Sequence, residues 1–488
     1  TVNYKPILNP VSGVYLGNYA ESSTPCKISA SSLSLQNKND WDFEAKTAEI
    51  YALQNQARKA MLEDYYATNE EDRPKKAHRV ANCRRDLRPV ITETDFNGKN
   101  QYEMAKPSVY QHIESSNTFF GGLMTCASGY ACPVCAPKIA EARAEEIRYA
   151  VTEWNKQGGV CLFLTLTFSH GRSESFKPLM SSFADAFRYF RSGKKFTEIS
   201  DDLGYLGFIR SIETTWGEAN GWHPHSHEIW FIDAEFVQKV KNEVKNDNNL
   251  ELSKEALDLL VNLKFKELLF KKWRDACLKA GLSEPSYERG MLVKIAETEE
   301  ELQSRLAEYL VKTGINKSPW GVDDEIVRLH SKKGKEGRFT PFDFLREQYN
   351  PDRTKAEKYR FRCLFAEYVN GFKGVAKIYW SPCKGMNRLG MKKYFNVDEL
   401  TDEDITDKKE EQAVLELEIP RPAWVYVIGI NDHRATLLLK SKAGGEELAK
   451  AYIWELFEKY NEYLPDGEKY HLLPETLQHI LDFYWESG

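Results

Sequence analysis

The alternation of apolar and polar positions predicts strands and helices in succession along the central part of the chain. Short apolar runs bounded by glycine or polar residues are typical of strands. Four such runs lie at residues 160–167, at 205–215, from His225 onward and at 291–296. The runs at 205–215 and from His225 onward are close enough to form a hairpin, and helical patterns separate the other runs. This order favours an α+β fold with an antiparallel sheet.

Apolar residues spaced three or four apart predict the helices between these strands. Pro137 suits a first helical turn, and Gly158-Gly159 ends the apolar stripe that follows it. The same spacing predicts helices at 41–66, 176–191, 236–244, 253–280, 299–311, 446–460 and 474–485. Alternating segments at 424–430 and 435–440 predict a hairpin near the end of the chain.

Alternating histidines stand at the start of the second hairpin strand. Residues i and i+2 of a strand point to one face, so His225 and His227 can offer two imidazoles to one ion. If residues 217–222 form the hairpin loop, Glu213 faces them across the ladder. Two imidazoles and a carboxylate leave open positions on Mn²⁺ or Mg²⁺, and His223 is a possible extra or outer-shell ligand. The alternative is a histidine-rich surface turn.

A second candidate for chemistry lies on the predicted helix at 299–311. Tyr309 and Lys312 are three apart on one helical face. A tyrosine can attack a phosphate, and a nearby lysine can lower its pKa or stabilise the charge that develops. The alternative is an ordinary core tyrosine, because Tyr309 borders the apolar stripe.

Cysteine spacing predicts a zinc site. Cys126, Cys132 and Cys135 supply three thiolates, and a tetrahedral structural site needs a fourth ligand. His112 and His78 are possible fourth ligands. An odd number of cysteines, nine, argues against a disulfide framework and for a reducing compartment. The alternative is a set of buried free thiols, which is also the expectation for Cys161, Cys277, Cys363 and Cys383.

Length and charge limit the class of protein. A chain of 488 residues predicts two or three domains. Without a long apolar run or a leader pattern, we expect no membrane span, no secretion signal and a cytoplasmic location. The net charge of -6 does not itself indicate nucleic-acid binding. Basic residues nevertheless gather at 75–85, 328–338, 353–362 and 384–393. One interpretation is a solvated surface. The other is a groove for single-stranded DNA, in which bases would stack on Tyr359, Phe361, Tyr379 and Trp380.

Several motifs occur in a fixed order. They are Leu-Thr-Leu-Thr at 164–167, Glu-Thr-Thr-Trp-Gly at 213–217, Gly-Trp-His-Pro-His-Ser-His at 221–227 and Glu-Tyr-Leu-Val-Lys at 308–312. In this order they resemble the motifs of bacterial plasmid rolling-circle replication initiators, which belong to the HUH (His-hydrophobe-His) endonuclease superfamily. The cysteine segment and the stretches at 337–342 and 371–381 are similar to further landmarks of that family. The resemblance covers roughly residues 80–410.

The resemblance implies a fold and a mechanism. The family fold is a five-stranded antiparallel sheet of RRM-like palm type flanked by helices, here with an N-terminal zinc knuckle and a small C-terminal α/β region. Tyr309 would attack one strand of origin DNA, single-stranded or in a hairpin, and Lys312 would support it. The products are a 5′-phosphotyrosyl intermediate and a free 3′ hydroxyl. The resemblance also implies Cys83 as the fourth zinc ligand.

Two positions depart from the family pattern. Ser226 stands where the family has a hydrophobic residue, and Thr313 stands where two-tyrosine members carry a second tyrosine. The chain therefore resembles a single-tyrosine initiator. It has no Gly-x-x-x-x-Gly-Lys-Ser/Thr phosphate loop, so a host helicase would unwind the DNA and a host polymerase would extend the 3′ end.

These observations divide the chain into four expected regions. Residues 1–75 have no assigned role, 76–136 would bind zinc, 137–395 would nick and join DNA, and 396–488 form a C-terminal region. Two other functions stay open at this point. One is an HUH transposase or conjugative relaxase, which shares the chemistry; the other is a non-catalytic zinc-containing DNA-binding regulator.

Overall fold

A computed structural model describes residues 38–94, 98–113, 115–171, 174–248, 252–296, 301–302, 337–386, 390–407, 413–429 and 433–460. The chain forms two compact units, residues 1–44 and residues 45–488. Of the first unit, the description covers only residues 38–44, the start of helix α1 (Lys38–Ala67). The features discussed below all belong to the second unit.

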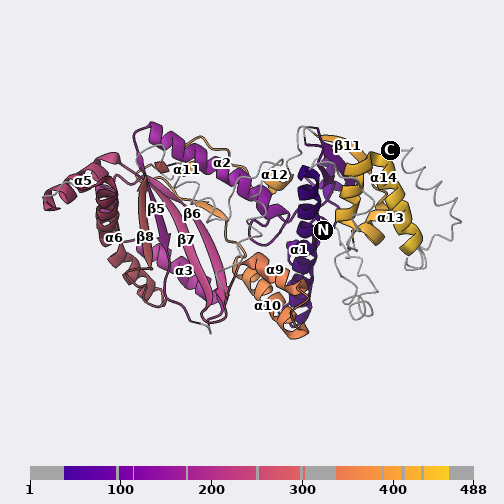
Figure 1. Cartoon of the computed structure of the whole chain (residues 1–488), viewed down its shortest axis with the longest axis horizontal. Helices are drawn as coiled ribbons and strands as arrows, with labels where there is room; N and C mark the ends of the chain where they lie inside the picture. Colours follow the sequence, from indigo (N-terminus) through magenta and orange to yellow (C-terminus); the bar gives the residue numbers. More distant parts are fainter. Residues whose placement is uncertain are drawn as a thin grey trace. The chain divides into compact units, whose positions relative to one another are not determined.

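The largest sheet is antiparallel and carries the candidate site. Its strands run in the order β10 (Ile378–Trp380), β6 (Gly207–Gly217), β7 (Gly221–Ile232), β5 (Val160–Leu166) and β8 (Met291–Ala296). The two-residue strand β9 (Arg338–Phe339) pairs with β6 off this path. Figure 1 shows β5 to β8 lying side by side. Successive residues of each strand point to opposite faces, so each face needs its own apolar cover.

Helix α2 (Cys135–Lys156) covers one face of this sheet. Its buried residue Ile147 belongs to one apolar cluster with Phe163 of β5, Ile209 of β6 and Ile229 of β7. Ile229 stands directly opposite both Phe163 and Ile209, so the three side chains lie on the same face of the sheet. The glutamate and histidines of interest share this face.

Helices α3 (Phe176–Phe190) and α6 (Lys254–Lys279) cover the other face with aromatic side chains. The ring of Phe190 lies 5.8 Å from that of Trp230 on β7 and 5.5 Å from that of Trp273 on α6. All three rings are buried. Burial of large aromatic side chains contributes strongly to the stability of such a core.

A second antiparallel sheet joins the cysteine-rich region to the end of the chain. Its order is β11 (Ala413–Glu418), β3 (Ser108–His112) and β4 (Thr118–Gly121). Helix α14 (Arg434–Tyr460) and Trp424 pack with these strands in one apolar cluster. The two regions, about 300 residues apart in the sequence, thus share a core.

The remaining elements are helices and a two-stranded sheet of β1 and β2. Helices α9 (Pro341–Tyr349) and α10 (Lys355–Gly371) each begin with a capping box, in which Thr340 pairs with Asp343 and Thr354 with Glu357. No described helix is long and apolar enough to cross a membrane. The further elements are η2 (Arg79–Asn82), β1 (Pro89–Thr94), β2 (Asn100–Met104), α4 (Lys194–Asp202), α5 (Ala234–Asn248), α9 (Pro341–Tyr349), α10 (Lys355–Gly371), α11 (Met391–Tyr394), α12 (Asp402–Asp407), α13 (Arg421–Ala423) and the π-helix η3 (Trp424–Ile428).

The α+β class with antiparallel sheets is confirmed. The strand predicted at 291–296 has those bounds, and α6 lies between caps at Ser253 and Ala280, as predicted. The main sheet has six strands where we expected five, because β9 adds to β6. The assignment to an HUH palm and the four-region boundaries stay predictions. The helix predicted at 299–311 lies almost entirely outside the described residues, and that at 474–485 wholly outside.

The predicted C-terminal hairpin is wrong. The segment 424–430 contains the π-helix η3, and 435–440 is the first part of α14. A short apolar run does not distinguish a strand from a buried helix, and here the run packs over the second sheet. Gly444 and Gly445 have non-helical backbone angles, so the helix predicted at 446–460 is the second half of α14.

A buried ion pair stabilises the aromatic face of the main sheet. Glu228 on β7 is fully buried, and it accepts hydrogen bonds from Arg191 and, at 2.7 Å, from the indole N–H of Trp230. The guanidinium of Arg191 also lies 3.9 Å from the ring centroid of Phe208. A carboxylate in such apolar surroundings depends on its cation.

We predict that Arg191→Leu destabilises the protein by about 3 to 5 kcal/mol, because it removes the cation that is hydrogen-bonded to the buried Glu228 carboxylate. The control is Arg188→Leu in the last turn of α3, which ends one residue before Arg191. Arg188 and its partner Asp185 are exposed, so this change should cost about 0.5 kcal/mol or less. Urea denaturation followed by tryptophan fluorescence measures both. Equal midpoints for the two variants would contradict the role of the buried pair.

Candidate metal centre

The β6–β7 hairpin brings the predicted metal ligands together. β6 ends at Gly217 and β7 begins at Gly221, close to the expected loop. In the register of this hairpin, Glu213 stands opposite His225, and Ser211 stands opposite His227. Directly opposed residues share a face, and His227 is two residues from His225 on its strand. All three side chains therefore lie on the α2 face.

One carboxylate oxygen faces both imidazoles. Oε2 of Glu213 lies 3.4 Å from Nε2 of His225 and 3.5 Å from Nε2 of His227. The three ligand atoms lie within 4.8 Å of one another. When an ion binds each ligand atom at about 2.1 Å, two ligand atoms lie about 3.0 Å apart if the ligand–metal–ligand angle is a right angle. They lie about 3.4 Å apart if that angle is tetrahedral. The donor set and its spacing therefore fit a divalent ion.

The second ring nitrogen of each histidine has its own partner. Nδ1 of His225 lies 3.2 Å from the carbonyl oxygen of His223, and Nδ1 of His227 lies 3.1 Å from the hydroxyl of Thr165. When Nδ1–H donates to these oxygens, the lone pair of Nε2 points toward the carboxylate. Such partners orient the imidazoles for metal binding.

Electrostatics keep the carboxylate of Glu213 ionised. Burial by itself raises the pKa of Glu213, but when the Nε2 atoms of His225 and His227 carry protons instead of facing a metal ion, their hydrogen bonds and positive charges outweigh the effect of burial. The net result is a pKa below the ordinary value of a glutamate. An anionic oxygen is the hard ligand that Mn²⁺ or Mg²⁺ requires.

His223 has different surroundings from the other two histidines. Its Nε2 lies 3.1 Å from the hydroxyl of Thr167, and its ring lies 4.6 Å from that of His170. Burial, with the charges of His225 and His170, lowers the pKa of His223 to about 3, so the ring is neutral near pH 7. The group of atoms close enough to share an ion does not include this histidine. In this geometry, His223 lies beside the three ligand atoms rather than among them.

The other predicted residues of the active site cannot be compared with the structure. Tyr309 and Lys312 lie outside the described residues, as does Thr313. The roles of Thr165 and Thr167 were not predicted from the sequence, although both belong to the Leu-Thr-Leu-Thr motif. The two threonines alternate with leucines on β5, so period-two spacing alone places them on one face.

Four cysteines from separate segments meet in a buried cluster. The sulfur of Cys83 lies 3.5 Å from those of Cys135 and Cys132, and the sulfur of Cys126 lies 3.8 Å from that of Cys135. In a tetrahedral zinc site with zinc–sulfur bonds of about 2.3 Å, the sulfur atoms lie about 3.8 Å apart. The cluster therefore fits a zinc ion, with Cys83 in the fourth position. Elsewhere, His78 caps η2 and Nδ1 of His112 accepts a hydrogen bond from the N–H of Ser115.

A buried arginine accompanies this cluster. Burial alone would lower the pKa of Arg84, but attraction to the thiolates of Cys135 and Cys83 outweighs it and raises the pKa. Its guanidinium donates a 2.8 Å hydrogen bond to the carbonyl of Phe120. A zinc ion with four thiolates carries two negative charges, which a nearby buried cation balances.

The remaining cysteines do not all match the expectation of buried thiols. Cys161, Cys277 and Cys383 are buried, but Cys363 is exposed. That part of the expectation is wrong, because Cys363 lies on the outer face of α10 rather than on its buried side. The exposed thiol provides an internal reference for chemical labelling.

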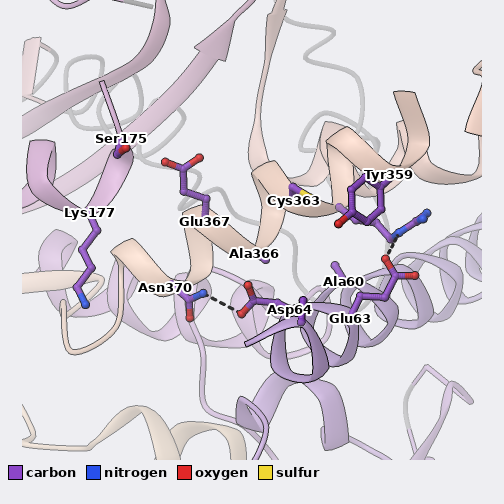
Figure 2. Close-up of a pocket in the computed structure, with 12 residues that line it drawn as sticks. Ala60, Glu63, Asp64, Ser175, Lys177, Tyr359, Cys363, Ala366, Glu367 and Asn370 are labelled. Carbon is purple, nitrogen blue, oxygen red and sulfur yellow. Dashed lines mark hydrogen bonds and ion pairs between the residues drawn. The ribbon is translucent and has the colours of Figure 1, made fainter. Parts of the chain in front are cut away.

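A cavity of about 350 Å³ lies between α1, α10 and the start of α3 (Figure 2). Two acidic side chains of α1 are paired with side chains of α10. Arg362 forms an ion pair with Glu63, and the side-chain N–H of Asn370 donates a 3.0 Å hydrogen bond to Asp64. The cavity lining contains no residue of the metal triad or of the cysteine cluster. We interpret the cavity as a polar seam between helices.

Two of the four aromatic residues expected to stack on DNA bases are available for that role. Tyr359 and Tyr379 are 54% and 41% exposed, whereas Phe361 is buried. Trp380 is partly buried. The prediction is therefore wrong for Phe361, because this ring packs on Phe339 and Phe344 in the core.

Comparison with known proteins identifies the segment that carries this site. Residues 123–262 match the family model described as replication protein. This segment is similar to the replication protein family. The match includes Glu213, His225, His227 and three of the four clustered cysteines. The expected resemblance to plasmid replication proteins is thus confirmed.

Individual proteins that match this chain include replication proteins. The chain is 32% identical to Protein rep of Streptomyces lividans over 253 residues, which cover 46% of this chain and 53% of that protein. It is 33% identical over 135 residues to a protein of Streptomyces cyanogenus named neomycin resistance protein, covering 23% and 31% of the two chains. It is 32% identical over 130 residues to Protein rep of a Bacillus species, covering 26% and 40%. The chain thus spans about half or less of the relatives it matches, and no solved structure matches.

Proposed function

We propose that this chain initiates rolling-circle replication by nicking one strand of origin DNA. The observation that carries the proposal is the Glu213 carboxylate, which faces His225 and His227 inside the segment that matches the replication protein family. Two imidazoles and one carboxylate leave open positions for a substrate oxygen. Phosphoryl transfer is the chemistry that such an open divalent site supports best.

Glu213, His225 and His227 would hold Mn²⁺ or Mg²⁺. When bound, such an ion polarises the scissile phosphate and stabilises charge on its oxygens. The protein's own residues orient this site. Thr165 and the carbonyl of His223 fix the two rings through their Nδ1 atoms.

Tyr309 would supply the nucleophile, and Lys312 would lower its pKa. The phenolic oxygen of Tyr309 forms a bond to phosphorus as the bond to the 3′ oxygen breaks. The tyrosine proton passes to solvent, and the leaving 3′ oxygen takes up a proton to become a hydroxyl. The phosphotyrosyl ester conserves the energy of the broken bond, so the reverse reaction rejoins DNA ends.

The proposal has consequences for partners. Origin DNA, single-stranded or in a hairpin at the nick, would be the substrate. A host helicase would unwind the duplex and a host polymerase would extend the 3′ hydroxyl. We propose a bacterial cytoplasmic location for this work. The four cysteines would hold a structural zinc ion that joins Cys83 to the 126–135 loop.

The histidines provide the first test. We predict that the double change His225→Ala and His227→Ala abolishes Mn²⁺-dependent nicking, because it removes two of three ligands. Duplex DNA binding should persist, since phosphate contacts come from separate cations. Calorimetric titration with Mn²⁺ measures the loss of the ion directly. The control is His112→Ala in the second sheet, and full nicking by the double variant in a chelating buffer would refute the metal assignment.

Tyr309 provides the decisive test of the covalent mechanism. Tyr309→Phe removes one oxygen and little volume, so stability should change little. Nicking should fall by about three orders of magnitude or more, because a phenyl ring cannot attack phosphorus. Mass spectrometry of the wild-type chain, incubated with Mn²⁺ and single strands tiling its replicon, should find a nucleotide on Tyr309. Tyr102→Phe on β2 is the control, and an adduct on another residue would exclude Tyr309.

The zinc assignment has a separate test. Metal analysis of the purified chain should find about one zinc ion per chain. Under native conditions, iodoacetamide should label the exposed Cys363 and leave Cys83, Cys126, Cys132 and Cys135 unlabelled. After removal of the metal with a strong chelator, the four should become reactive. A zinc-free chain whose four thiols react as fast as Cys363 would rule out the site.

A further inference from the structure

Two histidines outside the metal triad extend it by direct ring contacts. The ring centroid of His223 lies 5.2 Å from that of the ligand His225, and the ring centroid of His170 lies 4.6 Å from that of His223. The planes of these two pairs meet at 30° and 33°. Among the described residues, only His225 of these three belongs to the group of atoms that can share an ion. The other two imidazoles are therefore available for a different task.

Hydrogen bonds fix the ring of His170 in its place. Its Nδ1–H donates a 2.8 Å hydrogen bond to the carbonyl of Asn220, in the loop between β6 and β7. The hydroxyl of the preceding residue, Ser169, donates a 2.7 Å hydrogen bond to the carbonyl of Glu284. His170 is thereby held at the loop end of the hairpin. A ring that is already fixed loses little conformational entropy when it binds a partner.

The triad has an apolar neighbour on one side along its strands and polar neighbours on the other. Ile229 is the next residue after His227 on the same face, and it belongs to the apolar cluster under α2. In the opposite direction, His223 stands across the ladder from Thr215, and its Nε2 lies 3.1 Å from the hydroxyl of Thr167. A DNA strand is polar, so the loop end of the hairpin is the side of the triad that suits it.

The chemistry of the His170 ring favours a base over a phosphate. A neutral imidazole has one N–H, and in His170 the carbonyl of Asn220 already accepts it. A phosphate would need such a donor, whereas a base needs only a flat ring to stack on. His170 is partly exposed, and in the described part of the chain the ring of His223 is the one aromatic ring that it contacts.

We propose that His170 is the platform on which a DNA base stacks, one or two nucleotides from the scissile phosphate, and that His223 supports its ring. The inference rests on the proposed nicking function and names the part of the substrate that is held beside the metal. Two residues of a strand span about 7 Å, which is close to the length of one nucleotide. A phosphate at the triad and a base on His170 can therefore belong to neighbouring nucleotides. Every base has a flat face, so this contact positions the strand without selecting its sequence.

Three variants test the stacking. His170→Leu removes the flat ring, His170→Phe keeps one, and His112→Leu makes the same change in the second sheet as a control. The first readout is the affinity, in chelating buffer, for oligo(dT) and for an abasic oligomer with the same number of phosphates. His170→Leu should weaken binding of oligo(dT) by about 5- to 150-fold and leave binding of the abasic oligomer unchanged. Its salt dependence should also stay unchanged, because no phosphate contact is lost. His170→Phe and His112→Leu should bind both oligomers as wild type does.

Single abasic sites locate the base. They are placed in turn around the nick of the oligonucleotide on which the wild-type chain forms its adduct. At one position within about two nucleotides of the nick, the missing base should slow wild-type nicking by about 5- to 150-fold at low DNA concentration. The same abasic site should leave His170→Leu unchanged, because that variant has no ring on which the base can stack. His170→Phe and His112→Leu should respond as wild type does.

Any of four results would overturn the proposal. The first is an oligo(dT) affinity of His170→Leu equal to that of wild type. The second is an equal loss of affinity for oligo(dT) and the abasic oligomer, which would show that His170 only holds the loop. The third is a reduced salt slope in His170→Leu, which would indicate a phosphate contact. The fourth is equal sensitivity of wild type and His170→Leu at every abasic site, or a His170→Phe that behaves as His170→Leu does. If the wild-type chain forms no adduct, the nicking function fails instead, and the affinities for the two oligomers still judge the stacking.

Discussion

The antiparallel register between β6 and β7 is the constraint on which the candidate metal centre depends. A slip of one residue would turn Pro224 and Ser226 toward α2 and bury the histidines among aromatic rings. Packing on both faces excludes that slip. Ile229 belongs to the apolar cluster under α2, while Trp230 packs against Phe190 on the opposite face. The site is therefore as rigid as the core around it.

Adjacent residues of β7 place opposite chemistry on the two faces of one strand. His227 faces the carboxylate of Glu213 on the α2 side, and Glu228 pairs with Arg191 on the aromatic side. Each charge is balanced within its own face, as Arg84 balances the thiolates of the cysteine cluster. The net charge of the chain says little about such local pairs, because they cancel in the sum.

Features with a regular period could be predicted from the sequence. The triad follows from residues two apart on a strand and a hairpin of the right length, and the bounds of α6 follow from its helical spacing. Features that depend on distant packing could not be predicted. The pairing of β11 with β3 and the approach of Lys377 to Tyr130 join segments that no local pattern connects. The apolar run at 424–428 was misassigned for the same reason, since its partners decide whether it forms a strand or a helix.

The pairing of β11 with β3 also sets the order in which the folded state can be completed during synthesis. Tyr110 leaves the ribosome about 300 residues before its partner Leu415, an interval of about 15 to 60 s at ordinary rates of translation. The hairpin of the metal centre closes much sooner, since its two strands are consecutive. During that interval, one edge of β3 has no strand beside it, and open edges pair readily with other chains. The late arrival of β11 makes the cysteine-rich region, rather than the β6–β7 hairpin, the part of this protein most exposed to misassembly in the cell.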